Sequence, residues 1–137
     1  MIEGEIMKQY IMYKKCDNVL ILKLLVKRLD FYYSSEILQH ISKIVTKFTY
    51  INVLIDFCNI KTMSSSGIGL LLIVNKRLNL EKRKLGIVNI NPIINKVIHL
   101  LEVHTCFNVF NNMYEALKMF SDADYKKITE QKAVIIQ

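Results

Sequence analysis

Hydrophobic residues occur in short runs that alternate with longer amphipathic segments. Apolar, β-branched runs occupy residues 19–26, 51–57 and 85–90, and each is followed by polar residues. Runs of this length and composition are typical of buried strands. CFNVF, residues 106–110, predicts another short strand, and the segment around EIMKQYIMYK, residues 5–14, is either an edge strand or an arm.

Four amphipathic segments predict helices between and after these strands. After LDFYYSS, apolar residues follow one helical stripe, with Ser34 or Ser35 as the expected N-cap and His40 on a solvated polar face. SSSGIG, residues 64–69, precedes a second helix that we expect to continue to about Arg83.

Two further helices follow the third strand. Asn91-Pro92 predicts a helix start, because Asn caps a helix and Pro fits its first position. Asn111 or Asn112 is expected to cap the last helix. The expected buried positions of these two helices are Ile93, Ile94, Val97, Ile98 and Leu101, and then Met113, Ala116, Leu117 and Phe120.

The order of elements predicts an α/β fold. We expect a central mixed, largely parallel sheet of four to five strands with about four helices packed on it. Residues 1–120 would form a single domain, and residues 121–137, SDADYKKITEQKAVIIQ, a tail or an extra element.

Composition narrows the class of protein. With 137 residues, of which 52% are hydrophobic, the chain can bury a core. The net charge of +7 makes nucleic acid a partner to consider. The basic residues are scattered, however, and aromatic residues are not interleaved with them as a stacking surface requires. We therefore predict solvated surface lysines and no stable nucleic-acid complex, and nucleotide binding remains a lesser alternative.

Cysteine and histidine spacing gives no sign of a cofactor. Cys16, Cys58 and Cys106 are far apart and form no CxxC, which predicts reduced thiols in a cytoplasmic protein. His99 and His104 are five residues apart and would not share a helical face, so a metal pair is not expected. The N-terminal residues lack the basic-then-apolar order of a signal peptide, so we do not expect one, and no apolar run reaches the ~18 residues that a membrane span needs.

The serine-rich segment does not match a catalytic motif. No glycine precedes Ser64, Ser65 or Ser66 by two residues, so the G-x-S-x-G pattern of serine hydrolases is absent. No lysine follows the glycines, as a phosphate-binding loop would need. We predict a protein that is not an enzyme. Serines at a helix start cap the helix, and a phosphate added there is tolerated by the helix dipole.

These features together resemble the STAS domain family, in particular the bacterial anti-sigma factor antagonists. The resemblance covers roughly residues 10–120. It is carried by the strand that ends near Asp56 and the Ser-Ser-Gly-Ile-Gly that opens an apolar helix. Leu29-Asp30 and Asn91-Pro92 are further anchors.

The resemblance implies a phosphorylation site. Ser65 matches the serine that a partner kinase phosphorylates, Ser66 is its neighbour and the alternative acceptor, and Gly67 and Gly69 match close-packing glycines. Ser64 stands where the family usually has aspartate, and Lys27 where it tends to have glycine before the Leu-Asp pair. Both are departures from the pattern.

The resemblance also implies a function and partners. An anti-sigma factor antagonist binds an anti-sigma factor with serine kinase activity and releases a sigma factor, and a PP2C-type phosphatase reverses its phosphorylation. The expected contact surface is the loop at Asp30, residues 59–62 and the helix start. The residues expected at that helix start are Ser64, Ser65, Ser66, Gly67, Ile68, Gly69 and Leu70. The alternative is a STAS binding module without phosphorylation, such as a cytosolic subunit of a lipid or anion transporter. The oligomeric state stays open.

Overall fold

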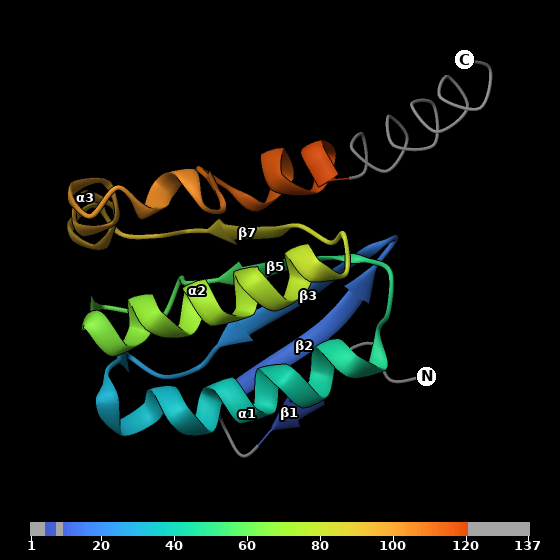
Figure 1. The fold of residues 1–137 in the computed structure, drawn as a ribbon, viewed down its shortest axis with the longest axis horizontal. Coiled ribbons are helices and arrows are strands. Elements are labelled where there is room, and N and C mark those ends of the chain that lie inside the picture. Colours follow the sequence, from blue (N-terminus) through green and yellow to red (C-terminus); the bar gives the residue numbers. More distant parts are fainter. Residues whose placement is uncertain (1–4, 8–9, 121–137) are drawn as a thin grey trace.

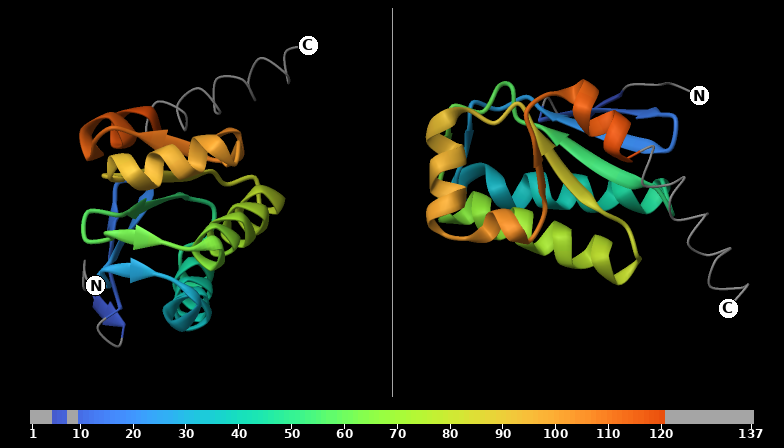
Figure 2. Two further views of the ribbon diagram at one scale, coloured as in Figure 1. Left: turned by 90° about the vertical axis from the view of Figure 1, so that its left-hand side faces the viewer. Right: turned by 90° about the horizontal axis from the view of Figure 1, so that it is seen from above.

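The computed structural model describes residues 5–7 and 10–120. The expected tail or extra element, residues 121–137, lies outside the described residues, and the division of the chain into a domain and a tail stays a prediction. A mixed sheet carries helices on both faces (Figures 1 and 2). The predicted α/β class, with a largely parallel sheet and about four helices, is confirmed.

The main sheet has six strands within the described residues, in the order β1-β2-β3-β5-β7-β8. These strands are β1 (Glu5–Met7), β2 (Ile11–Cys16), β3 (Val19–Leu24), β5 (Asn52–Asp56), β7 (Leu85–Val88) and β8 (Asn108–Phe110). β1, β2 and β3 pair antiparallel, and β5, β7 and β8 extend the sheet parallel to β3. The N-terminal segment thus supplies two strands at one edge, which makes the sheet wider than we predicted.

The helices are α1 (Phe31–Lys47), α2 (Ser65–Leu80), α3 (Pro92–Leu100), the 3-10 turn η1 (Val103–Thr105) and a helical segment over residues 113–120. α1 and α2 lie side by side over one face of the sheet, and residues 113–120 lie over the other (Figures 1 and 2). Alternate residues of β3 pack on opposite faces of the sheet. Leu20, Leu22 and Leu24 pack in the core under α1 and α2, whereas Val19 and Ile21 pack in the opposite cluster.

α1 begins earlier than the sequence suggested. Asp30 is its N-cap, and the Asp30 carboxylate accepts hydrogen bonds from the N–H groups of Tyr32 at 3.1 Å and Tyr33 at 3.4 Å. The prediction of Ser34 or Ser35 as the cap is therefore wrong. Ser34 already lies within the first turn, where its hydroxyl donates to the Asp30 carbonyl at 2.6 Å.

Two predictions of exposure are also wrong. His40 was expected in solvent, but it is 5% exposed and lies beside Tyr10, with ring centroids 6.0 Å apart. Within α3, only part of the predicted stripe is buried: Ile94 and Ile98 are in the core, whereas Ile93 is 73% exposed. The short α3 lies at the end of the sheet, where a narrow face of the helix is covered (Figure 1).

α2 ends at Leu80, before the predicted limit at Arg83. The backbone leaves the helical region at Lys82, whose φ is 59°. Arg83 is 2% exposed, and its guanidinium donates to the carbonyls of Ile51 at 2.6 Å and Phe48 at 2.7 Å. This buried cation joins the end of α1 to the start of β5.

Candidate functional site

A second, two-stranded sheet assembles the candidate site. β4 (Arg28–Leu29) pairs parallel with β6 (Thr62–Met63). β4 leads into α1 and β6 leads into α2, so the pairing brings the starts of both helices to one end of the molecule (Figure 1). The Ser64 N–H also donates to the Leu29 carbonyl at 3.1 Å. Asp30 and the serine segment, which the resemblance placed on one contact surface, are therefore neighbours.

The three serines have different environments. Ser64 is the N-cap of α2, and its hydroxyl accepts a hydrogen bond from the Ser66 N–H at 3.2 Å. Ser65 is the first residue of the helix and is exposed. Ser66 is half-buried. Because Ser64 performs the capping, the fold does not require the hydroxyl of Ser65 for that purpose.

The two glycines differ as well. A Cβ on Gly67 would lie 2.6 Å from the Leu29 carbonyl oxygen and 2.5 Å from Cγ of Met63, so Gly67 allows α2 to approach β4 closely. A Cβ on Gly69 would meet no atom within 4 Å. The expectation that Gly69 is a close-packing glycine is wrong, because it faces open space beside the helix.

The remaining predicted contact residues divide between surface and core. Ile68 is 7% exposed and Leu70 is 2% exposed, and both belong to the core. Asp30 retains 31% of its side-chain exposure, but its carboxylate caps α1 and pairs with Arg28 Nε at 2.7 Å. Capping α1 is thus a role that the structure shows for Asp30.

Asparagine side chains hold the loops around the site. Asn91 Nδ2 donates to the carbonyls of Ile60 at 3.2 Å and Lys61 at 2.9 Å, while Asn91 Oδ1 caps α3. Asn59 Nδ2 donates to the Leu24 carbonyl at 3.1 Å. The sequence identified Asn91 as a helix cap, but nothing local to it indicated that its amide also fixes the loop before α2.

The end of the molecule at the starts of α1 and α2 is electropositive. Neither helix has an acidic residue in its first turn. A helix N-terminus carries about half a positive charge, and α1 and α2 both begin here. Lys27, Arg28 and Lys61 are exposed nearby, and the Lys61 N–H donates to the Lys27 carbonyl. A phosphate or a carboxylate is the kind of group that this surface favours.

Cys58 and Asp56 lie near the site but lack the properties of a catalytic pair. Desolvation raises the pKa of the Cys58 thiol, and the neighbouring Asp56 carboxylate raises it further. The thiol is therefore protonated at neutral pH and a poor nucleophile. The Asp56 carboxylate accepts from the Cys58 N–H at 2.9 Å and from Asn89 Nδ2 at 3.0 Å. Both polar contacts stabilise the end of β5.

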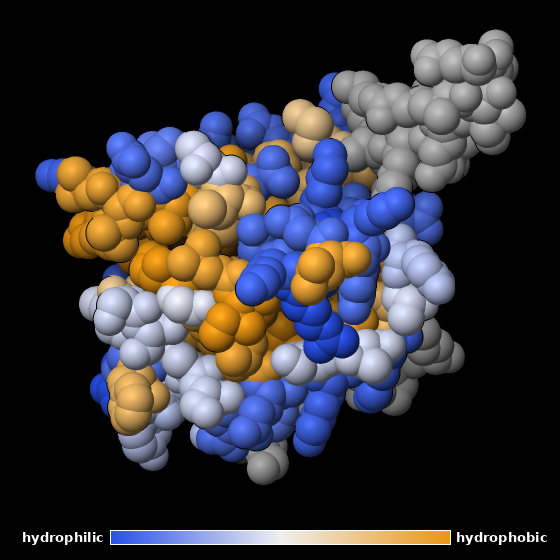
Figure 3. Space-filling model, in the orientation of Figure 1, coloured by the Kyte–Doolittle hydropathy of each residue, from blue (hydrophilic) through white to orange (hydrophobic). Residues whose placement is uncertain are grey.

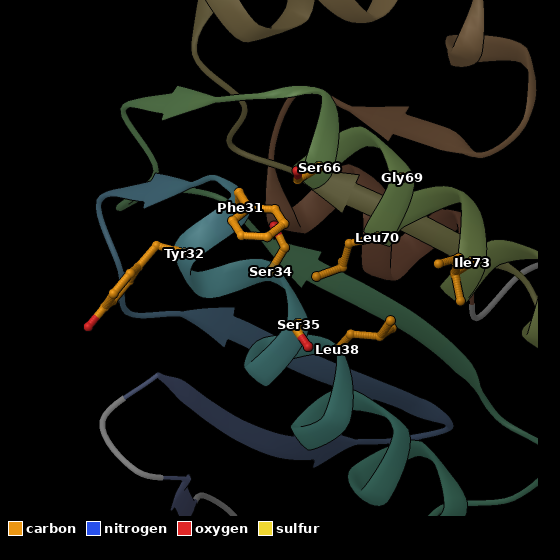
Figure 4. A pocket seen from close by; sticks show the side chains of 9 residues that line it. All are labelled: Phe31, Tyr32, Ser34, Ser35, Leu38, Ser66, Gly69, Leu70 and Ile73. Carbon is orange, nitrogen blue, oxygen red and sulfur yellow. The ribbon is translucent and has the colours of Figure 1, made fainter.

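A groove opens beside the exposed serine, between the N-terminal halves of α1 and α2 (Figure 4). Its volume is about 650 Å³. The residues that line it, which define the α1–α2 groove, are Phe31, Tyr32, Ser34, Ser35 and Leu38 from α1 and Ser66, Gly69, Leu70 and Ile73 from α2. Apolar surface lies between the two helices and is bordered by polar and charged residues (Figure 3).

The two histidines were not expected to share a helical face, yet the fold brings them into contact. His99 is on α3 and His104 on η1, yet their rings stack with centroids 4.2 Å apart. The chain turns back between them, with Glu102 at a φ of 58°. Within residues 5–7 and 10–120, no group of three or more His, Cys, Asp or Glu side chains could hold a metal ion.

No helix in the described part of the chain has both the length and the apolar character that crossing a membrane requires.

Together, the fold and the site define an α/β domain that presents serine hydroxyls at the start of a helix, near the carboxyl ends of the parallel strands of its sheet. The family model of the STAS domain matches residues 10–116. The chain belongs to the STAS domain family. No curated protein sequence matches it.

Solved structures share this fold at low sequence identity. An anti-sigma factor antagonist (STAS) domain protein from Planctomyces limnophilus is similar with a TM-score of 0.75 and 18% identity, over 81% of this chain and 97% of that one. The Bacillus cell fate determinant SpoIIAA in its phosphorylated form has a TM-score of 0.60 and 19% identity, over 80% and 97%. The murine anion transporter Slc26a9 has a TM-score of 0.71 and 15% identity, over 87% of this chain but 21% of the transporter.

Proposed function

We propose that this protein is an anti-sigma factor antagonist whose binding is switched off by phosphorylation of Ser65. In the cytoplasm it binds an anti-sigma factor that has serine kinase activity, and the bound sigma factor is released. A phosphate on Ser65 blocks the complex, and a PP2C-type phosphatase restores it. The protein acts by binding, without catalysis and without a cofactor.

The exposure of Ser65 at the first position of α2 carries this proposal. A kinase can reach its hydroxyl, and the capping bond belongs to Ser64 instead. Phosphorylation adds about −1.5 to −2 charge at pH 7. The N-terminus of α2, without an acidic residue in its first turn, favours that charge. The fold therefore tolerates the phosphate, while a partner docked over this end meets a bulky dianion.

The family relationship supports the choice of partner. Proteins described as anti-sigma factor antagonists share the fold over most of this chain, and one that is so described, SpoIIAA, was also solved in a phosphorylated form. Ser64, in place of the usual aspartate, removes a negative charge next to the acceptor while keeping a good N-cap.

Phosphorylation by the anti-sigma kinase is the direct test. We expect incubation of the full chain with that kinase and ATP to add one phosphate, which peptide mass spectrometry should locate on Ser65. Ser65→Ala should abolish the modification and keep the complex with the kinase, whereas Ser65→Glu should weaken that complex. Thr49→Ala is a control, because Thr49 also carries an exposed hydroxyl but follows the C-terminal end of α1, away from the start of α2.

Phosphate on Thr62, or on no residue, would contradict the assignment of Ser65. A complex equally strong with Ser65→Glu would contradict the switch.

A second candidate function is a STAS binding module without phosphorylation, for instance a cytosolic subunit of a lipid or anion transporter. The similarity to a segment of an anion transporter and the replacement of the usual aspartate by Ser64 favour it. In that case pull-down of the full chain should recover a permease or ATPase, and Ser65→Glu should leave the recovery unchanged.

A further inference from the structure

Gly69 keeps the α1–α2 groove open, although the packing of α2 does not require a glycine at this position. Gly69 is half-buried within α2, and glycine inside a helix costs about 1 kcal/mol relative to alanine. Close packing does not explain its presence, since a Cβ there would meet no atom within 4 Å. Any longer side chain at this position would project into the groove that Gly69 lines (Figure 4).

Apolar side chains around the groove remain open to solvent. Phe31 is 85% exposed, Tyr32 is 72% exposed and Ile73 is 55% exposed. Leu38 and Leu70 line the groove between them (Figure 4). Contiguous apolar surface with a polar border is typical of a protein interaction site. A groove between two neighbouring helices can bind an amphipathic helix, whose apolar face packs into the groove.

The charges around the groove are positive at both ends. At one end are the N-termini of α1 and α2, together with exposed Arg28. The Asp30 carboxylate at this end is already paired with Arg28. At the other end are exposed Lys76 and half-buried Arg77, whose guanidinium donates to Thr46 Oγ1 at 2.6 Å and pairs with Glu81 at 3.6 Å. Lys76 follows Ile73 by three residues and therefore lies on the same side of α2.

We infer that the α1–α2 groove binds an amphipathic helix of the protein partner that carries leucine-like side chains on one face and carboxylates along its flanks. This inference rests on the proposed function, because it assigns the chemistry of the partner that the function requires. The apolar face enters between Leu38, Gly69 and Ile73, and the carboxylates meet the helix N-termini and Lys76.

Two other occupants fit the groove less well. A second copy of this chain would bring the same positive ends together in a symmetric contact, and like charges oppose that contact. The C-terminal segment, residues 121–137, follows Phe120, which packs on the face of the sheet opposite to α1 and α2.

The inference also explains how phosphorylation would weaken binding. Ser65 and Ser66 lie at the end of the groove where α1 and α2 begin. A dianion on Ser65 reverses the sign of the charge that a partner carboxylate meets there. The apolar part of the groove remains in place, so the effect is electrostatic and should be smaller at high salt.

Synthetic helical peptides test the groove without any kinase. One peptide carries leucines on one face and glutamates on its flanks, and the second has lysines in place of the glutamates. Binding to the full chain is followed by amide chemical shifts and by fluorescence anisotropy. We expect the glutamate peptide to bind about tenfold more tightly than the lysine peptide at low salt, with shifts gathered at Leu38, Ser66 and Ile73.

Three variants check the location. Gly69→Phe fills the groove and should weaken the glutamate peptide about tenfold. Ile93→Phe, on the exposed side of α3, is the matched control and should leave binding unchanged. Lys76→Glu should weaken the glutamate peptide and strengthen the lysine peptide, a reversal that a general loss of structure would not produce.

Equal affinity for the two peptides, or unchanged binding in Gly69→Phe, would overturn the inference. Concentration-dependent shifts in the groove of the free protein would identify a second copy as the occupant, and shifts on deletion of residues 121–137 would identify the C-terminal segment. Either result would also overturn it. The assay contains neither kinase nor ATP, so a failure here is distinct from a failure of Ser65 phosphorylation.

Discussion

Gly67 and Gly69 stand two residues apart on α2 and have opposite surroundings. Gly67 faces the Leu29 carbonyl, which also accepts the Ser64 N–H that precedes α2. Gly69 faces the groove. The first glycine is therefore required by packing, and the second is explained by the surface that it leaves open.

Alanine at each glycine should separate these roles. Gly67→Ala forces β4 away from α2, and we expect it to lower the free energy of unfolding by about 1–2 kcal/mol, an overpacking cost partly offset by better helix propensity. Gly69→Ala should raise the free energy of unfolding by up to about 1 kcal/mol. Urea denaturation of both variants measures the two values. Equal effects of the same sign would show that the two sites are not distinct.

At the scale of elements, α1 and α2 have similar N-termini. Each begins with a polar cap, Asp30 or Ser64, and each lacks acidic residues in its first turn. The β4–β6 pair places the two starts together. Positive partial charge is therefore concentrated where Ser65 is exposed, which is the physical condition for a phosphate to be added without unfolding the helix.

A carboxylate at Ser65 should stabilise α2. We expect Ser65→Asp to raise the free energy of unfolding by about 0.3–1 kcal/mol, because the charge lies at the helix N-terminus. Asn79→Asp, an exposed change near the C-terminal end of the same helix, should lower it. Thermal and urea unfolding at low and high salt measure both effects, which should shrink as salt rises. A destabilising Ser65→Asp would remove the basis for tolerance of the phosphate.

At the scale of the whole molecule, the net charge is +7, and basic side chains that the structure describes lie at both edges of the sheet. Lys14 and Lys15 lie on β2, and Lys27 lies just before β4, near the carboxyl end of β3. Lys84 directly precedes β7, which is the amino end of a parallel strand and thus the other edge of the sheet. No single row of these side chains can follow a phosphate backbone.

Duplex DNA should therefore not be retained at about 0.15 M salt, where exposed charges are screened beyond roughly 8 Å. Any complex at low salt should weaken steeply, with a slope of log affinity against log salt of about −0.9 per phosphate contacted. Fluorescence anisotropy with labelled DNA over a salt series measures this. A complex that survives physiological salt would restore nucleic acid as a partner.

The order of strands and helices, the cap at Asn91 and the buried face of residues 113–120 could all be read from the sequence. Periodicity and capping are local properties. The spacing of Ala116 and Phe120, which are both buried, can be recognised within two turns of helix. The SSSGIG segment and its neighbours were sufficient to indicate the STAS domain family.

Only the tertiary structure decided which distant residues meet. The stacking of His99 on His104, the burial of Arg83 and the close approach of Gly67 to the Leu29 carbonyl all depend on contacts between separate elements. The open side of Gly69 likewise exists only because α1 lies beside α2. Such contacts arise from how whole elements pack, and no short window of sequence contains that information.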